Sequence, residues 1–242
     1  MIRFILTDIE GTTSDISFVK EILFPYAAQH LPNYIRQFHQ LPKVSSQLKL
    51  VAEESQCSIE DVEQLIATLL SWIEQDLKKT PLKELQGEVW AYGYEQGHFK
   101  GHLYQDAFEQ LSWWQQQGLA LGIYSSGSVK AQKLLFSHSD YGDLTPLFSQ
   151  YYDTKIGHKR EVQAYQAIVQ DLLEKGVIKH PEEVLFLSDV VAELDAAQAA
   201  GLHTAELRRD QQKGSADHPS VSSFNQLTAC LPLLAESLKE KQ

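Results

Sequence analysis

Short apolar segments alternate with helical patterns over most of this 242-residue chain, and this alternation strongly limits the folds that it can adopt. Four apolar runs bounded by turn residues are typical of buried strands: 2–7, 119–124, 184–187 and 202–205. A further short strand is expected at 150–152. Strands that alternate with helices favour a parallel sheet with right-handed crossovers. We therefore predict the α/β fold class, with a parallel sheet flanked by helices.

A long helical stretch, residues 17–100, separates the first strand from the rest of the chain. Pro32 is expected to open a short helix in it, and the clearest amphipathic pattern starts after Ser58. This stretch shows no convincing strand pattern. We therefore predict an all-helical domain of residues 17–100, inserted after the first strand of a core domain that combines residues 1–16 and 101–242.

Charge and cysteine content argue against several classes of protein. The net charge is −11 and lysines and arginines form no basic cluster, so we expect no nucleic-acid partner. No apolar run approaches the roughly 20 residues of a membrane helix, so we expect no membrane partner. Cys57 and Cys230 lack metal-site spacing, and the chain starts with a strand pattern instead of a signal peptide. These features predict a cytoplasmic protein with ordinary thiols.

Polar residues follow three of the predicted strands at the point where each strand ends. They are Asp8 and Glu10 after the first strand, Ser125 and Ser126 after the second, and Asp189 after the third. Ligands of open parallel sheets bind beyond the carboxyl ends of the strands. One polar strand end is weak evidence, but three at one edge of the sheet predict a reaction site there.

Asp8 is the candidate nucleophile. A carboxylate can attack phosphorus and form an aspartyl-phosphate that water then cleaves, provided that a cation relieves the repulsion of the anionic substrate. Asp8 and Asp189 offer oxygen ligands of the kind that Mg²⁺ prefers. Glu10 could protonate a leaving group and later deprotonate water. Taken alone, Asp8 could equally cap a turn, and Glu10 could be a solvated glutamate.

The remaining polar residues also have two interpretations. Ser125 and Ser126 precede a helix and could donate hydrogen bonds to a phosphate, although such serine clusters also mark ordinary loops. Lys159 could neutralise the phosphate, but an isolated lysine is usually a solvated surface residue. The sequence alone ranks Lys159 poorly against Lys155 and Arg160.

The order of these residues resembles the four motifs of the haloacid dehalogenase superfamily. The motifs are the segment Asp8-Ile-Glu-Gly-Thr12, then Ser125, Lys159 and Asp189. Glu10 stands where most phosphatases of this group have Asp. Together with Tyr-Ser-Ser-Gly-Ser, Gly-His-Lys and Leu-Ser-Asp, this glutamate makes the chain similar to the enolase-phosphatases of methionine salvage. The resemblance implies a Rossmann-like sheet and a helical cap between the first two motifs, where residues 17–100 lie.

The resemblance also implies a reaction. The expected substrate is a small phosphorylated diketone, 5-methylthio-2,3-dioxopentyl phosphate, which is enolised and then dephosphorylated to the acireductone 1,2-dihydroxy-5-methylthiopent-1-en-3-one. The resemblance assigns catalysis to Asp8, Glu10 and Lys159, phosphate binding to Ser125, Ser126 and Lys159, and Mg²⁺ to Asp8, Glu10 and Asp189. Residue 10 would bind the metal through its side chain or its backbone carbonyl. A monomer is expected.

The sequence leaves three points open. For the enolisation base, Glu10 competes with a residue from the cap. The methylthio end of the substrate could contact cap aromatic residues, although their helical spacing favours packing, or Lys100 and His102. The alternative functions are a phosphatase for another small metabolite, a catalytically silent binding module and a dehalogenase, and the motif residues argue against the last two.

Overall fold

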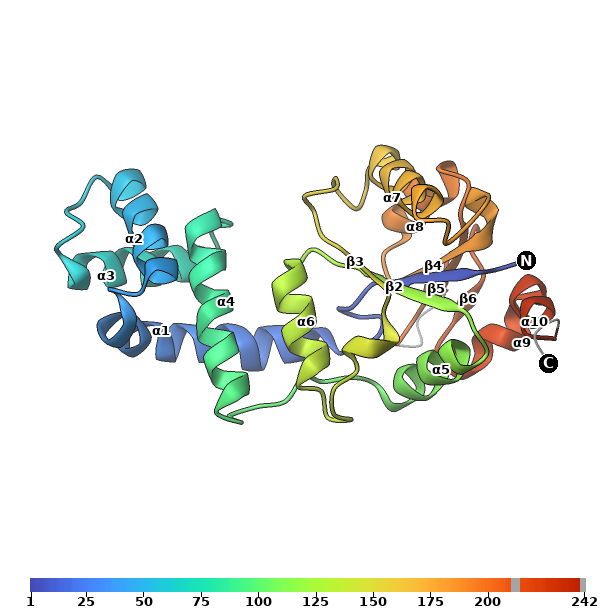
Figure 1. The fold of residues 1–242 in the computed structure, drawn as a ribbon, viewed down its shortest axis with the longest axis horizontal. Helices are drawn as coiled ribbons and strands as arrows, with labels where there is room; N and C mark the ends of the chain where they lie inside the picture. Colours follow the sequence, from blue (N-terminus) through green and yellow to red (C-terminus); the bar gives the residue numbers. More distant parts are fainter. Residues whose placement is uncertain (210–213, 240–242) are drawn as a thin grey trace. The chain divides into compact units, whose positions relative to one another are not determined.

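The computed structural model describes residues 1–209 and 214–239. In this part of the chain a six-stranded parallel sheet has the order β3-β2-β1-β4-β5-β6 (Figure 1). The strands are β1 (Phe4–Thr7), β2 (Ala120–Tyr124), β3 (Gln150–Tyr152), β4 (Val184–Ser188), β5 (His203–Leu207) and β6 (Ser220–Val221). The predicted α/β class and parallel sheet are confirmed, and β6 is an additional short strand.

Helices cover both faces of this sheet. Figure 1 shows α7 (Val162–Glu174) and α8 (Val191–Ala199) on one face and α5 (Gln105–Gln116) on the other. The sheet is also accompanied by α6 (Val129–Ser137), α9 (Leu227–Cys230), α10 (Pro232–Lys239) and three 3₁₀ turns, Thr145–Leu147, Pro181–Glu183 and Phe224–Gln226. Leu6 of β1 and Phe186 of β4 share a buried core with Tyr165 of α7. This close-packed core holds the strand ends in place.

The strand order runs outward in both directions from β1. The neighbours of β1 are β2 on one side and β4 on the other, and Thr7 pairs with both Ile123 and Leu187. The residues that follow these three strands are therefore level with one another at the carboxyl edge of the sheet. A crevice at such a switch point is where open α/β sheets bind their ligands.

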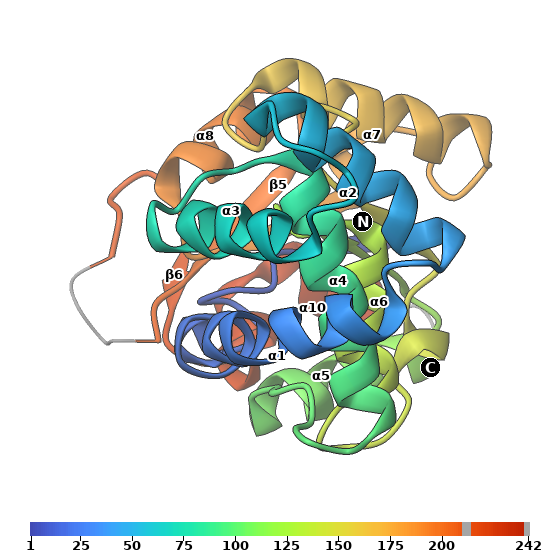
Figure 2. The same cartoon turned by 90° about the vertical axis from the view of Figure 1, so that its left-hand side faces the viewer.

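The chain forms two compact units, Met1–Ile16 with Gly101–Gln242, and Ser17–Lys100. The second unit contains only helices and turns: a π-helix (Phe18–Leu23), α1 (Phe24–Phe38), α2 (Pro42–Ser55), α3 (Val62–Glu74) and α4 (Thr80–Glu95). Figure 2 shows α4 beside both α1 and α2. The four α-helices bury an apolar core of their own, with Leu31, Leu48, Leu69 and Leu85. Residues 17–100 thus form a helical unit that follows the first strand in the chain.

Two details of the helical unit differ from the sequence prediction. Pro32 lies inside α1 and does not open a helix, because Pro25 already occupies the first turn and the helix continues through residue 32. The α3 helix begins after Asp61 and not directly after Ser58. The reason is that the Asp61 side chain accepts a hydrogen bond from the Gln64 N–H at 3.0 Å and caps the helix there.

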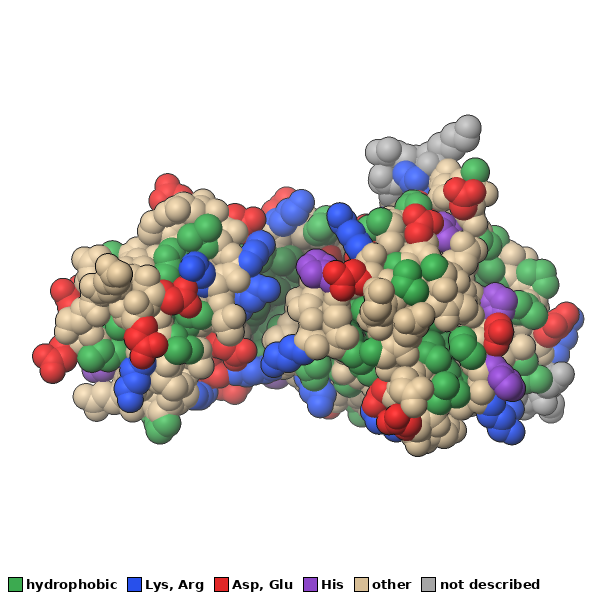
Figure 3. Space-filling model, turned by 90° about the horizontal axis from the view of Figure 1, so that it is seen from above, with side chains coloured by type: hydrophobic (Ala, Val, Ile, Leu, Met, Phe, Trp, Pro, Cys, Tyr) green, Lys and Arg blue, Asp and Glu red, His purple; other side chains and the backbone are tan. Residues whose placement is uncertain are grey.

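Acidic side chains are spread over the face shown in Figure 3, with lysine and arginine side chains between them. This distribution agrees with the net charge of −11. Within residues 1–209 and 214–239, no helix combines the length and the apolar character needed to cross a bilayer.

Candidate active site

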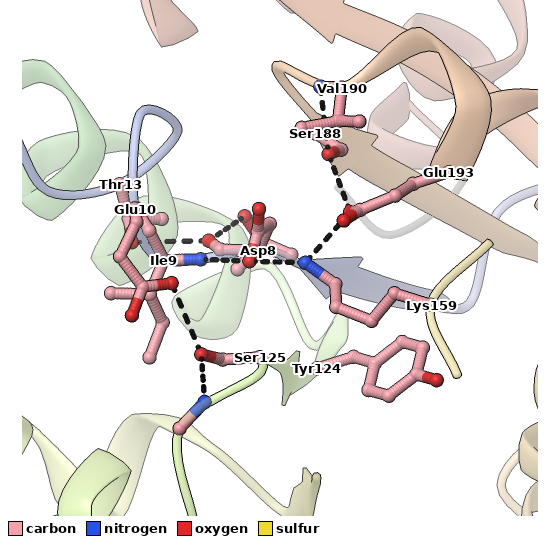
Figure 4. A network of polar contacts seen from close by, with 12 residues as sticks. Asp8, Ile9, Glu10, Thr13, Tyr124, Ser125, Lys159, Ser188, Val190 and Glu193 are labelled. Carbon is pink, nitrogen blue, oxygen red and sulfur yellow. Dashed lines mark hydrogen bonds and ion pairs between the residues drawn. The ribbon is translucent and has the colours of Figure 1, made fainter. Parts of the chain in front are cut away.

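Asp8 lies directly after β1, and only 3% of it is exposed. Its backbone N–H donates to the Leu187 carbonyl oxygen at 2.9 Å, which continues the pairing of β1 with β4. Its Oδ1 atom accepts a hydrogen bond from the Ile9 N–H at 2.8 Å and contacts Lys159 Nζ at 2.6 Å (Figure 4). Both side-chain contacts use Oδ1, so the carboxylate is held in one orientation.

Lys159 is the cation that contacts this carboxylate. It comes from the segment between β3 and α7, where the Tyr165 hydroxyl donates to the Lys159 carbonyl oxygen at 2.7 Å. Lys159 is buried, whereas Lys155 and Arg160 are exposed. The structure thus distinguishes Lys159 from the two neighbouring cations that the sequence does not separate.

Glu193, in the first turn of α8, is a second partner of Lys159 and is not among the predicted residues. Its Oε2 atom lies 2.7 Å from Lys159 Nζ and accepts a hydrogen bond from the Ser188 hydroxyl at 3.0 Å. Figure 4 shows Lys159 between the carboxylates of Glu193 and Asp8. Burial opposes the charge of Lys159, but these two carboxylates outweigh burial, so the pKa of the lysine lies above its ordinary value. The sequence offers no specific signal for Glu193, because an acid in the first turn of a helix is common.

Glu10 and Ser125 are in direct contact. The Ser125 hydroxyl donates to Glu10 Oε2 at 3.2 Å and accepts a hydrogen bond from the Gly127 N–H at 3.1 Å (Figure 4). The pKa of Glu10 is raised, first by burial and then by the charge of Asp8, so this carboxyl group is able to hold a proton for transfer. The Ser125 N–H donates to the Tyr152 carbonyl oxygen at 3.2 Å, which leaves the hydroxyl as the group that faces Glu10.

The loop that follows the candidate nucleophile Asp8, residues 9–14 and here named the nucleophile loop, is a tight turn around one carbonyl group. The Ile9 carbonyl oxygen accepts hydrogen bonds from the N–H groups of residues 12, 13 and 14 at 3.1, 2.9 and 2.9 Å. Gly11 has a φ of +78°, and a Cβ atom at this position would lie 2.2 Å from Asp189 Oδ2. Glycine permits both this backbone conformation and the close approach. The loop therefore packs directly against the carboxylate of Asp189.

Asp189 follows β4 and forms a pair of neighbouring carboxylates with Asp8. Asp189 as a whole residue is exposed to solvent, but the protein atoms packed around its carboxyl group raise its pKa to about 6, and the charge of Asp8 adds to the shift. Two carboxylates that repel one another suit a divalent cation with oxygen ligands. Within the described residues, no three His, Cys, Asp or Glu side chains form a metal-binding group. A cation here would therefore combine these two side chains with a backbone oxygen.

Other residues that the sequence singled out lie outside this set of contacts. Ser126 is exposed beside Ser125, and Lys100 is exposed at the end of the helical unit. His102 Nδ1 accepts a hydrogen bond from the Asp15 N–H at 3.1 Å, so this ring supports the backbone of its own unit. The aromatic residues of α3 and α4 pack within the helical unit, as their spacing indicates: Trp72, Trp90, Tyr92 and Tyr94.

Comparisons with known proteins identify the family to which this chain belongs. A family model described as haloacid dehalogenase-like hydrolase matches residues 2–201. The chain is 54% identical over 223 residues to enolase-phosphatase E1 of Pseudomonas fluorescens, with 92% of this chain and 96% of the relative covered. It is 50% identical over 227 residues to enolase-phosphatase E1 of Serratia proteamaculans, with 94% and 97% covered. The chain belongs to the haloacid dehalogenase-like hydrolases, in their enolase-phosphatase family.

The fold of this haloacid dehalogenase-like hydrolase is also similar to that of a solved structure. The UTR4 protein of Saccharomyces cerevisiae is 37% identical and has a TM-score of 0.77, with 94% of this chain and 100% of the yeast chain covered. The match therefore spans both the sheet and the helical insert. In this family member, residues from the ends of two strands and from one intervening segment come together: Asp8, Glu10, Ser125 and Lys159.

Proposed function

We propose that this chain is a bifunctional enolase-phosphatase of methionine salvage. It converts 5-methylthio-2,3-dioxopentyl phosphate to the acireductone 1,2-dihydroxy-5-methylthiopent-1-en-3-one and phosphate. The observation that carries the phosphatase chemistry is the buried 2.6 Å contact between Asp8 Oδ1 and Lys159 Nζ at the carboxyl edge of the sheet. The substrate follows from relatives that are named enolase-phosphatases and align over 92–94% of this chain.

In the proposed dephosphorylation, Asp8 attacks phosphorus of the enolised substrate. A bond forms between the Asp8 carboxylate and phosphorus while the bond from phosphorus to the enol oxygen breaks, and Glu10 donates a proton to that oxygen. Glu10 is then a carboxylate and removes a proton from water, which attacks the aspartyl-phosphate and releases phosphate. The raised pKa of Glu10 supports this double role, because the group must carry a proton in the first step.

Lys159 and the serines are proposed to hold the phosphoryl group. The buried ammonium of Lys159 already faces Asp8, so its charge also offsets the negative charge that accumulates on the phosphoryl oxygens. Ser125 offers its hydroxyl in contact with Glu10, and Ser126 is exposed beside it. Donors that are already fixed in place need little reorganisation during the reaction.

We propose Mg²⁺ as the cofactor, held by Asp8, residue 10 and Asp189. The neighbouring carboxylates of Asp8 and Asp189 support the first and third ligands. The Glu10 side chain accepts a hydrogen bond from the Ser125 hydroxyl. Because the side chain is engaged in this way, we favour the backbone carbonyl of residue 10 as the second ligand. When bound, the metal supplies positive charge that reduces the repulsion between the anionic substrate and the attacking carboxylate.

We also propose that the two parts of the chain have different roles. Residues 1–16 and 101–242 form the catalytic core, and residues 17–100 form a cap domain. The separate apolar cores of the two parts support this division. We propose that the protein is a cytoplasmic monomer. Sedimentation of the purified protein tests its oligomeric state.

The proposed function is tested by comparing turnover of the diketone phosphate with turnover of a panel of sugar phosphates, with Mg²⁺ present. We expect a preference for the diketone phosphate, with equal yields of acireductone, seen by its absorbance, and inorganic phosphate. A preference for a sugar phosphate without acireductone absorbance would assign the site to another small metabolite. Absence of phosphate release from every ester would overturn the phosphatase proposal.

A further inference from the structure

Arg209, two residues beyond the end of β5, binds the nucleophile loop. Its Nε and Nη2 atoms both donate to the carbonyl oxygen of Thr12, at 3.0 and 2.8 Å. Thr12 is fully buried, and the Arg209 side chain is only 15% exposed. Two N–H groups of one planar guanidinium therefore fix the position of a single carbonyl group close to the nucleophile.

The guanidinium group is itself held from two sides. Its Nη1 atom donates to Asp106 Oδ2 at 2.7 Å, and the same oxygen accepts hydrogen bonds from the Ser223 hydroxyl at 2.7 Å and the Phe224 N–H at 2.8 Å. The guanidinium carbon lies 4.1 Å from the ring centroid of Tyr104. A cation that is fixed by a charged acceptor and an aromatic face has little freedom to move.

The nucleophile loop connects this arginine to the reacting groups. Thr12 is adjacent to Gly11, which packs against the Asp189 carboxylate. The hydroxyl of the next residue, Thr13, donates to the Asp8 carbonyl oxygen at 3.2 Å. A displacement of the Thr12 carbonyl group would therefore also displace Gly11 beside Asp189 and Thr13 beside Asp8.

We propose that Arg209 is a positioning residue for the phosphoryl transfer, which keeps the nucleophile loop in its reactive arrangement by holding the Thr12 carbonyl group. Arg209 acts through the loop and touches no reacting atom. The kinetic part of this inference rests on the proposed phosphatase function. The structural part, the restraint of the loop, is independent of any substrate.

The test compares two neighbouring arginines. Arg209→Met keeps an apolar stem and removes all five N–H donors. Arg208→Met is the matched control, because the ion pair of Arg208 Nη1, at 3.4 Å, is with Glu206 Oε1 of β5. We expect Arg209→Met to lower kcat per folded molecule by about tenfold or more and to change KM by less than about threefold. Arg208→Met should leave kcat and KM unchanged.

Amide hydrogen exchange supplies a readout that does not require turnover. In Arg209→Met the amides of residues 12–14 should exchange faster, while amides of α7 keep the wild-type rate. Arg209→Lys should recover part of kcat and of the protection, because an ammonium group lacks the planar pair of converging donors. If Arg209→Met does not fold, kcat, KM and amide exchange are compared between Arg209→Lys and the wild-type protein instead.

The outcomes separate this proposal from the proposed function. Kinetics are measured with the phosphate ester that the wild-type protein hydrolyses best, so a wrong substrate assignment leaves the comparison intact. Wild-type exchange rates at residues 12–14 in Arg209→Met would overturn the inference, even if no ester were hydrolysed. A kcat for Arg209→Met equal to that for Arg208→Met would overturn it as well.

Discussion

Lys159 carries the positive charge on which the candidate site depends. It is buried between two carboxylates, Asp8 and Glu193, at 2.6 and 2.7 Å. Removal of one partner from a buried ion pair leaves an uncompensated charge and costs about 3–5 kcal/mol. Lys159→Met should therefore lower the free energy of unfolding by about 3 kcal/mol at neutral pH.

This loss of stability should become smaller as the pH falls. In Lys159→Met the folded protein binds protons on its buried carboxylates more tightly than the unfolded chain does, so its stability rises as the pH decreases. Urea unfolding at about pH 7.5 and about pH 5 measures both effects. The exposed neighbour Lys155 gives the control, since Lys155→Met should cost less than about 0.5 kcal/mol. Equal stability of the two variants would contradict the role of Lys159.

Asp189 should make magnesium binding depend on pH. Its pKa of about 6 lies above the ordinary value, so in metal-free protein its contribution to stability is lost as the pH rises through about 6. A proton also competes with Mg²⁺ for this carboxylate, and affinity should therefore increase from about pH 5 to about pH 7.5, with proton release on binding. Calorimetric titration in buffers of different ionisation enthalpy measures affinity and proton release. Asp189→Asn should bind weakly at both pH values, whereas a pH-independent wild-type affinity would exclude Asp189 as a ligand.

At the level of elements, the turn from β1 into the nucleophile loop sets the geometry of the site. Gly11→Ala would place a methyl group 2.2 Å from Asp189 Oδ2. We expect a loss of about 2 kcal/mol in stability and weaker Mg²⁺ binding. Gly97→Ala is a matched control, because its φ of +69° imposes similar backbone strain while no atom lies within 4 Å of the added Cβ. Unchanged Mg²⁺ affinity in Gly11→Ala would show that the contact with Asp189 is unimportant.

The secondary-structure element that carries each site residue determines whether that residue can be predicted from the sequence. Asp8, Ser125 and Asp189 are predictable because each follows an apolar run, and parallel strands bring their carboxyl ends to one edge. The family resemblance names Lys159, but the residue pattern does not, because an aperiodic segment does not indicate which of its cations is buried. Glu193 escapes prediction because an acid in the first turn of a helix is common on exposed surfaces as well. The two-residue strand β6 is too short to produce an alternating pattern.

At the scale of the whole chain, each of the two units has its own apolar core. Leu172 of α7 and Leu69 of α3 are fully buried, one in each core. Replacement of such a leucine by alanine costs about 2–5 kcal/mol. Leu172→Ala should accelerate amide exchange mainly in residues 1–16 and 101–242, and Leu69→Ala mainly in residues 17–100. Equal acceleration in both units by either variant would contradict their independence.

The covalent role of Asp8 is the central claim for the molecule as a whole. Its most direct test is to quench the wild-type protein with acid during turnover of the diketone phosphate and to analyse its peptides by mass spectrometry. We expect the mass of one phosphoryl group on the peptide that contains Asp8. Asp8→Asn should fold normally, carry no label and release no phosphate. Rapid turnover without a phosphorylated Asp8 peptide, or near-normal phosphate release by Asp8→Asn, would contradict the claim.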